Sequence, residues 1–247
     1  MRLTVLGGCG AWPEAGQACS GYLVEHDGFR LVVDLGYATF PRLLEHTAAA
    51  DIDAVLISHG HPDHCADLNP LLRARALADD PVAALPVYAL RGALDAVLAL
   101  DRPGMYTDAI DQQVIRPEEM LQIGPFRVAT RLLPHWLPNV GIRLEAAGSA
   151  LAYTGDSGSV PQIAELATDA SLLLAEATYL EQVPEDSARF LSSATAAGRW
   201  AEQAGVGQLV LTHLWPGSDK NAAAAIARQS YAGEVAVATA GMEIELS

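Results

Sequence analysis

Short apolar runs alternate with amphipathic segments along the whole chain, and Gly and Pro residues separate them. Short apolar runs bounded by turn residues are typical of strands, and apolar positions repeating every three to four residues are typical of helices. We predict strands over 3–7, 20–26, 29–36, 52–59, 86–90, 126–135, 140–146, 150–156, 171–179, 208–213 and 234–239. We predict helices over 39–49, 66–79, 91–100, 159–168, 193–204 and 219–230. No long linker, charge block or repeat interrupts this alternation, so one α/β domain is expected over residues 1–247.

Five of the predicted strands end at a side chain that can bind a metal or carry a proton. In open α/β sheets, ligand sites gather beyond the carboxyl ends of the strands, where loops hold polar groups on a rigid scaffold. We therefore expect the five strand ends to converge on one rim. The five residues are His59, His135, Asp156, Glu176 and His213.

The stretch SHGHPDHC, residues 58–65, contains three of the seven histidines of the chain and one aspartate. In an extended loop, side chains at positions i and i+2 face the same way, so His59 and His61 can bind one ion. Pro62 stiffens the turn that follows, after which Asp63 and His64 can reach a second ion. The spacing therefore predicts a site for two metal ions.

Imidazole and carboxylate ligands suit zinc, and they also suit manganese or iron. The strand-end residues complete a set of candidate ligands without cysteine, which disfavours a closed structural zinc site. The seven candidate ligands are His59, His61, Asp63, His64, His135, Asp156 and His213.

Fifteen basic and thirty acidic residues give the chain a formal charge of −15, and Lys220 is its only lysine. Nonspecific nucleic-acid binding depends on neutralisation of phosphates by Lys and Arg, so extended nucleic-acid binding is not expected. Bound divalent metals would make the site far more positive than the surface. A small anionic molecule is therefore the expected substrate.

Hydrophobic residues make up 51% of the chain, but its apolar stretches are broken well before the length of a membrane span. The first apolar run is too short for a signal-peptide core, so we expect a cytoplasmic protein without a membrane segment. Cys9, Cys19 and Cys65 form an odd set without framework spacing, which fits a reducing compartment. Cys65 borders the histidine cluster, and its role is left open.

The residues His59, His61, Asp63 and His64 match in full the HxHxDH signature of the metallo-β-lactamase superfamily, which the chain resembles over nearly its entire length. The resemblance implies a four-layer αβ/βα sandwich with a dinuclear site at the edge of two packed sheets. It further implies that Asp34 braces the ligand loop and that Asp156 bridges the two ions. His135 and the closing His213 complete the implied ligand set.

Three further segments resemble ribonuclease Z-related phosphodiesterases, including bacterial enzymes that hydrolyse cyclic nucleotides. These segments are GGCGAWPEAGQACSGYLVE (7–25), AEATY (175–179) and VLTHLWPG (210–217). True β-lactamases commonly carry Arg at the position of His64 and Cys at the position of Asp156, so the resemblance argues against antibiotic hydrolysis.

Two departures from this branch bear on the substrate. Ribonuclease Z inserts a long tRNA-gripping arm between the counterparts of His135 and Asp156, but only twenty residues separate the two here. Relatives also carry a His that pairs with the counterpart of Glu176 and helps to protonate the leaving group. In this chain that position is Phe190, whose ring donates no proton.

These observations predict a dinuclear phosphodiesterase for a small substrate such as a cyclic nucleotide, in which a metal-bridging hydroxide attacks phosphorus. His59, His61, His135 and Asp156 hold one ion, and Asp63, His64, Asp156 and His213 hold the other. Asp63 receives the proton of the nucleophile, and Glu176 is the second candidate catalytic residue. The resemblance also allows a homodimer.

Ligand motifs do not encode the leaving group, so two other functions remain open. One is hydrolysis of a carboxylic ester, thioester or lactone, and the other is a metal-containing binding module with low activity. Three aromatic residues, Trp136, Tyr179 and Trp215, lie next to strand-end residues of the site. They can stack on a nucleobase or pack the wall of the site, and wall packing is the simpler interpretation.

Overall fold

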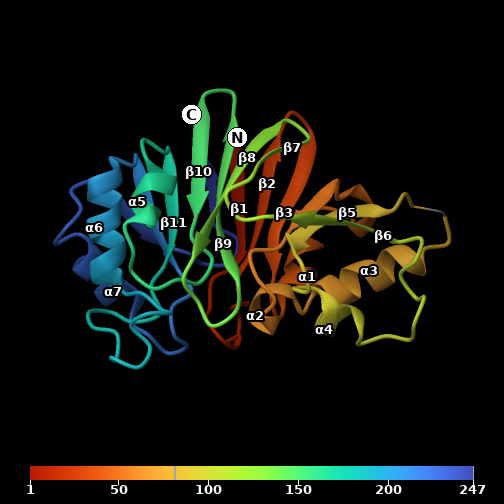
Figure 1. Cartoon of the computed structure of the whole chain (residues 1–247), viewed down its shortest axis with the longest axis horizontal. Helices are drawn as coiled ribbons and strands as arrows, with labels where there is room; N and C mark the ends of the chain where they lie inside the picture. Colours follow the sequence, from red (N-terminus) through yellow and green to blue (C-terminus); the bar gives the residue numbers. More distant parts are fainter. Residues whose placement is uncertain (81, 247) are drawn as a thin grey trace.

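The computed structural model describes residues 1–80 and 82–246, and its strands form two sheets of seven strands each (Figure 1). The N-terminal sheet has the order β14 (Glu243–Glu245), β1 (Arg2–Gly7), β2 (Gly21–His26), β3 (Phe29–Leu35), β4 (Ala54–Leu56), β5 (Leu85–Leu90) and β6 (Ile110–Ile115). The C-terminal sheet has the order β13 (Glu234–Val237), β12 (Gln208–Thr212), β11 (Leu172–Glu176), β10 (Ser149–Tyr153), β9 (Asn139–Ala146), β8 (Phe126–Leu133) and β7 (Met120–Ile123).

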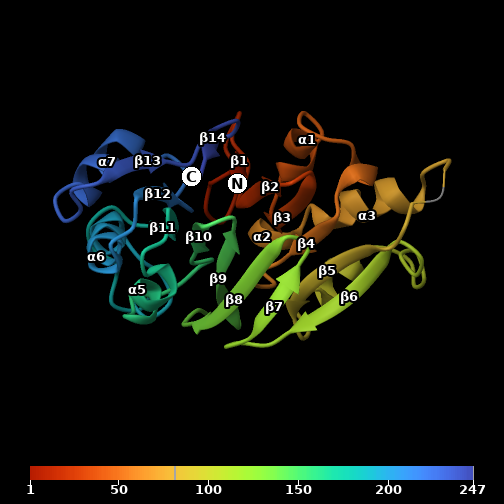
Figure 2. The ribbon, with the colours of Figure 1, turned by 90° about the horizontal axis from the view of Figure 1, so that it is seen from above.

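Helices cover the outer faces of both sheets, as the two views in Figures 1 and 2 show. Beside the N-terminal sheet lie α1 (Thr39–Leu43), the 3₁₀ turn η1 (Ala49–Asp51), α2 (Pro62–Cys65), α3 (Leu68–Ala76) and α4 (Asp95–Leu98). Beside the C-terminal sheet lie α5 (Gln162–Ala167), α6 (Ala194–Ala204) and α7 (Lys220–Ala227). This arrangement confirms the predicted four-layer αβ/βα sandwich. Among the helices of the described residues, none has the length and apolar character that crossing a bilayer requires.

Three apolar clusters fill the three interfaces between the four layers. The central cluster joins the two sheets and includes Tyr22, Phe126 and Tyr153. A leucine-rich cluster packs α3 against the N-terminal sheet, and an alanine-rich cluster packs α5, α6 and α7 against the C-terminal sheet. Small side chains let the last two helices approach closely, since a Cβ at Gly198 would lie 2.4 Å from the carbonyl oxygen of Ala227.

Strand direction brings five carboxyl ends to one edge of the C-terminal sheet. β10, β11, β12 and β13 are parallel neighbours. β8 runs in the same direction as β10, because both pair antiparallel with β9. In the N-terminal sheet, β3, β4, β5 and β6 are likewise parallel.

The structure corrects several predicted boundaries. β4 covers only Ala54–Leu56 of the predicted strand 52–59, and the predicted helix 39–49 ends at Leu43. The predicted helix 91–100 contracts to Asp95–Leu98. The turn predicted after His61 is the short helix α2, because Pro62 occupies a first-turn position where its fixed φ favours a helix.

Three strands were not predicted: β6, β7 and β14. All three are edge strands: β6 and β14 form the two edges of the N-terminal sheet, and β7 forms one edge of the C-terminal sheet. Much of β6, with the sequence IDQQVI, is exposed. A strand with one face in water has a weak apolar signal, so its identity depends on the neighbour with which it pairs.

Candidate metal centre

Seven histidine and aspartate side chains gather where the two sheets meet, and they divide into two groups of four that share Asp156. The ligand atoms within each group all lie within 4.8 Å of one another. The first group is His59, His61, His135 and Asp156, and the second is Asp63, His64, Asp156 and His213. The structure thus brings together all seven residues that the sequence predicted as ligands, in the two predicted groups.

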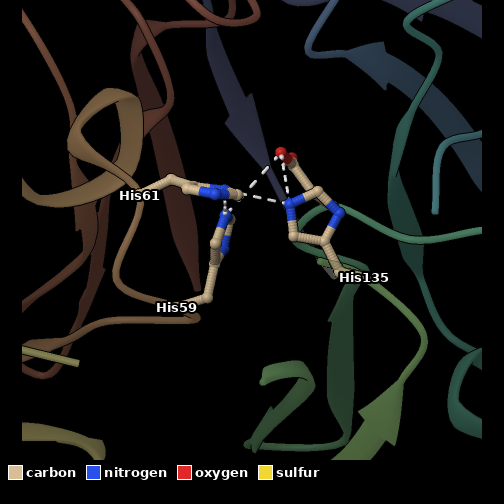
Figure 3. Close-up of side chains that lie close together, drawn as sticks. His59, His61 and His135 are labelled. Atoms are coloured by element: carbon tan, nitrogen blue, oxygen red, sulfur yellow. Dashed lines mark hydrogen bonds and ion pairs between the residues drawn. The ribbon is translucent and has the colours of Figure 1, made fainter. Parts of the chain in front are cut away.

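The two sheets contribute different members of the cluster. His59 and the turn of α2 follow β4 of the N-terminal sheet. His135, Asp156 and His213 follow β8, β10 and β12 of the C-terminal sheet. The predicted single rim is therefore a seam between two sheets, and Figure 3 shows His59 and His61 facing His135 across it.

In the first group, three imidazoles point their nitrogens at one another. His61 Nδ1 lies 3.1 Å from His59 Nε2 and 3.0 Å from His135 Nε2. Asp156 Oδ2 lies 3.7 Å from Nε2 of both His59 and His135. Tetrahedral zinc with bonds of about 2.0–2.1 Å separates neighbouring ligand atoms by about 3.3 Å. The donor set and its spacing therefore fit a zinc ion.

In the second group, two buried polar atoms have no hydrogen-bond partner among the described residues. They are His64 Nε2 and Asp156 Oδ1, which lie 3.1 Å apart. His213 Nε2 lies 3.2 Å from carboxylate oxygens of both Asp63 and Asp156. Buried polar atoms without partners are costly, and a bound cation would satisfy both of them. This group also fits a metal ion.

Hydrogen bonds to Nδ1 orient four of the five imidazoles so that Nε2 faces the cluster. His64 Nδ1 lies 2.8 Å from Asp34 Oδ2, and His135 Nδ1 lies 2.9 Å from the Phe190 carbonyl oxygen. His213 Nδ1 lies 3.0 Å from Thr178 Oγ, and His59 Nδ1 lies 3.1 Å from Ser58 Oγ. Such partners fix the tautomer and ring orientation that metal binding needs.

Burial lowers the pKa of His59, His61 and His135, which keeps the three imidazoles of the first group neutral. Burial acts in the same direction on His64, but the carboxylates of Asp156 and Asp63 outweigh it and raise the pKa of His64. Neutral imidazole is the form that binds a metal. Metal binding at the second group must therefore displace protons.

Asp34 is the centre of a buried network beneath the cluster. Its carboxylate accepts hydrogen bonds from the Ser58 amide (2.7 Å), the Ser58 hydroxyl (2.8 Å) and the Tyr153 hydroxyl (2.8 Å), in addition to His64 Nδ1. Asp34 is fully buried and adopts a left-handed backbone with φ 56°. The contacts agree with the bracing role that the family resemblance implied.

Glu176 is 2% exposed and organises loops around the site. Its two carboxylate oxygens accept hydrogen bonds from the Ser157 amide, the Ser192 amide, and both the amide and hydroxyl of Thr178. Burial, reinforced by the charge of Asp156, raises the pKa of Glu176 to about 7. Through Thr178, Glu176 is linked to the ring of His213.

Several contributors to the site were not predicted. Ser58 and Thr178 contact the imidazoles of His59 and His213 through their hydroxyl groups, and the Tyr153 hydroxyl donates to Asp34. The only sequence signal for these three residues is that they lie within the segments SHGHPDHC (58–65), AEATY (175–179) and YTGD (153–156). The Ala11 amide donates to Asp63 Oδ2 at 2.8 Å from a left-handed backbone with φ 62°. An alanine in the sequence gives no indication that its backbone amide will bind a carboxylate.

Cys65 lies beside the cluster but outside both groups of ligands. Its side chain is buried, and burial raises the pKa of the thiol to about 12. A neutral buried thiol is a small apolar side chain rather than a metal ligand or nucleophile.

A cavity of about 380 Å³ opens over the cluster. Aromatic and apolar side chains surround the ligands that face it. Its lining comprises Ala11, His61, Asp63, His135, Trp136, Asp156, Tyr179, Ser187, Leu191, His213 and Trp215.

The sandwich of two sheets, with a His/Asp cluster at their seam, defines a metallo-hydrolase of the metallo-β-lactamase fold. Residues 16–214 match the Beta-lactamase superfamily domain, and the chain belongs to this superfamily. It is 32% identical to the probable metallo-hydrolase YhfI of Bacillus subtilis over 87% of each chain. The crystal structure of YhfI superposes with a TM-score of 0.90 over 99% of each chain, at 29% identity.

Two further relatives extend the comparison. The chain is 27% identical to a ribonuclease Z of Kineococcus radiotolerans, over 86% of this chain and 83% of the relative. The short form of human tRNase Z shares the fold with a TM-score of 0.80 over 100% of each chain, at 23% identity. The predicted superfamily, fold and hydrolase class are confirmed.

Proposed function

We propose that this hydrolase is a phosphodiesterase that acts on a small phosphodiester, such as a cyclic nucleotide, with two divalent metal ions, zinc being preferred. The observation that carries the proposal is the pair of four-residue groups sharing Asp156. Similarity to a ribonuclease Z supports it, because ribonucleases cleave phosphodiester bonds. We further infer that residues 1–247 act as one hydrolase domain, since the central apolar cluster draws on both sheets.

His59, His61, His135 and Asp156 would hold one ion, and Asp63, His64, Asp156 and His213 the other. Two such ions supply an activated water nucleophile near neutral pH and neutralise charge that develops on phosphorus. The buried imidazoles of the first group are already neutral, so they are ready to bind without losing protons.

Asp63 is the proposed acceptor of the proton from the attacking water. Burial opposes its ionisation, but His64 and His213 outweigh burial and hold its pKa well below the ordinary value. The Ala11 amide and His213 Nε2 both contact Oδ2, which fixes the orientation of the carboxylate. The carboxylate is therefore ionised, and it lines the cavity over the cluster, so it can accept a proton from a water molecule bound there.

A small substrate is favoured by the segment between His135 and Asp156. In ribonuclease Z this interval carries the tRNA-gripping arm, whereas here it is occupied by the antiparallel strands β9 and β10. A substrate with a good leaving group is favoured by Phe190, which has no proton to donate. We propose that Glu176 acts on the leaving group only indirectly, through the loops that it organises.

The proposal is tested by metal analysis followed by assays of the zinc- or manganese-loaded protein. The substrates are bis-p-nitrophenyl phosphate, 2′,3′- and 3′,5′-cyclic nucleotides, a lactone and a thioester. We expect turnover of phosphodiesters, and a loss of at least about 100-fold in Asp63→Ala and His61→Ala. His46→Ala, which removes an exposed histidine that belongs to neither group of ligands, is the matched control.

Three outcomes would contradict the proposal. Turnover of the lactone or thioester without any phosphodiester would assign the protein to the other hydrolase class. Full phosphodiesterase activity in Asp63→Ala and His61→Ala would show that the cluster does not carry the reaction. Metal binding without turnover of any substrate would favour the binding module.

A further inference from the structure

Three of the four tryptophans have much of their surface exposed, and two of them, Trp136 and Trp215, line the cavity. Trp12 is 47% exposed, Trp136 is 51% exposed and Trp215 is 41% exposed. The fourth, Trp200, packs against the alanine-rich cluster, and its indole N–H donates to Ser159 Oγ. Exposed apolar side chains that gather at a cavity mark a binding surface.

One aromatic pair is attached to the first group of ligands. Trp136 directly follows His135, and its ring lies 5.1 Å from the ring of Phe190 with an interplanar angle of 30°. The Phe190 carbonyl oxygen holds His135 Nδ1, and the Arg189 guanidinium lies 5.6 Å above the Phe190 ring. Phe190 therefore supports one face of Trp136, while Trp136 lines the cavity.

A second aromatic pair is attached to the second group of ligands. Trp215 lies two residues after His213, and its ring meets that of Trp12 edge to face at 5.0 Å. Trp12 follows Ala11, whose amide holds Asp63. Each pair is thus fixed to the backbone that positions metal-binding residues, so a group held by the aromatic rings is kept near the cluster.

Apart from the candidate metal centre, the walls of the cavity offer no positive charge for a highly anionic ligand. Among the described residues that line the cavity, none is Lys or Arg, and two are aspartates. Metal ions in the cluster would supply the positive charge for one phosphate, and the walls offer aromatic faces instead of further cations. The recognised molecule therefore combines a single phosphodiester with a planar apolar group.

We propose that Trp136 and Trp215 are specificity-determining residues that stack on a planar aromatic group of the substrate, namely a nucleobase. This inference rests on the proposed phosphodiesterase function and names its substrate class. It also gives Phe190 a role, because its ring supports the stacking wall. A nitrophenyl ester shares the planar chemistry, so nucleotide and aryl probes are separate arms of the test.

The binding arm measures recognition without turnover. The metal-loaded protein is titrated with adenosine 5′-monophosphate and with ribose 5-phosphate, which carries the same phosphate but no base. We expect the nucleotide to bind about 5- to 150-fold more tightly, the range found for stacking of one base on an aromatic side chain. Trp136→Leu and Trp215→Leu should each reduce this ratio, and Trp200→Leu should leave it unchanged.

The kinetic arm separates stacking from damage to the cluster. With a 3′,5′-cyclic nucleotide, Trp136→Leu should raise KM about tenfold and leave kcat within about threefold. Trp136→Phe should restore most of the binding. Methyl p-nitrophenyl phosphate shows whether a simple aryl ring is stacked in the same way.

The results test the stacking proposal and the proposed phosphodiesterase function separately. Equal affinity for the two phosphates, or no binding of either, would overturn the stacking proposal. Unchanged KM in both leucine variants would overturn it as well, as would equal losses in the Trp200→Leu control. Selective nucleotide binding in a protein without phosphodiesterase turnover would overturn the proposed function and leave aromatic recognition standing.

Discussion

Phe190 stands where the resemblance to ribonuclease Z-related enzymes predicts a proton-donating histidine, and the structure shows what its ring and backbone contact instead. Its ring stacks on Trp136, and its carbonyl oxygen accepts a hydrogen bond from His135. Glu176, the partner expected for such a histidine, is instead bonded to Ser157, Thr178 and Ser192. Phe190 therefore contributes an aromatic wall and a backbone brace. The proton for the leaving group has to come from another group.

Phe190→His is expected to accelerate the reaction with poor leaving groups, because a positioned general acid is worth about 10²–10⁴ in rate. The measurement is kcat for a series of aryl phosphodiesters with leaving groups of increasing pKa. The gain should grow as the leaving group becomes poorer. Phe190→Leu removes the ring without adding a donor, so it controls for the loss of stacking. An identical dependence on leaving-group pKa in all three proteins would count against the argument.

At the level of elements, the turn of α2 has to pack closely on the end of β3. Gly36 follows β3, and a Cβ at this position would lie 1.8 Å from the backbone oxygen of Asp63. Backbone atoms cannot move aside as the end of a flexible side chain can. The absence of a side chain at Gly36 therefore permits the loop that carries Asp63 and His64 to lie against β3.

Gly36→Ala is expected to destabilise the protein by about 1–3 kcal/mol through overpacking, and to weaken zinc binding at the same time. Denaturant unfolding measures the first effect and zinc titration the second. Gly28→Ala is the matched control: Gly28 lies in an open turn with φ 80°, so its replacement strains the backbone without touching the site. Normal zinc affinity in Gly36→Ala would disprove the proposed coupling between this contact and the ligands.

At the level of the whole molecule, two tyrosines connect the sheets beneath the cluster. Tyr22 of the N-terminal sheet is hydrogen-bonded to Thr212 of the C-terminal sheet at 2.6 Å. Tyr153 of the C-terminal sheet donates to Asp34 of the N-terminal sheet at 2.8 Å. Burial, with the charge of Asp34, raises the pKa of Tyr153 well above its ordinary value, so the phenol keeps its proton. Because the ligands come from both sheets, these bonds help to set the distances between them.

Tyr153→Phe is expected to cost about 1.5 kcal/mol of unfolding free energy and about 10- to 100-fold in zinc affinity, since Asp34 orients His64. Thermal unfolding is measured with zinc and with a chelator, and zinc should stabilise the variant less than the parent. Tyr231→Phe is the matched control, because the buried Tyr231 hydroxyl donates to the Val206 carbonyl away from the site. Equal zinc affinity in the two variants would refute the bracing role of Tyr153.

Much of the fold and the site followed from local patterns in the sequence. Runs such as 29–36 and 208–213 are buried on both faces, so their apolar composition alone predicts strands. His59 and His61 are two positions apart, and this spacing was sufficient to place their side chains on one side of an extended segment. By contrast, β6 and β14 are partly exposed edge strands, and their sequences resemble loops until a neighbouring strand is present.

The sequence by itself determined which side chains are the candidate ligands, which of them follow strand ends, and the superfamily, because each depends on residues close together or on a recognisable motif. Only the tertiary structure decided that His59 meets His135 across two sheets, that Glu176 is bonded to loops, and that Trp136 stacks on Phe190 at the mouth. These contacts join segments distant in the chain. Their geometry depends on sheet packing and burial, which no local pattern of residues encodes.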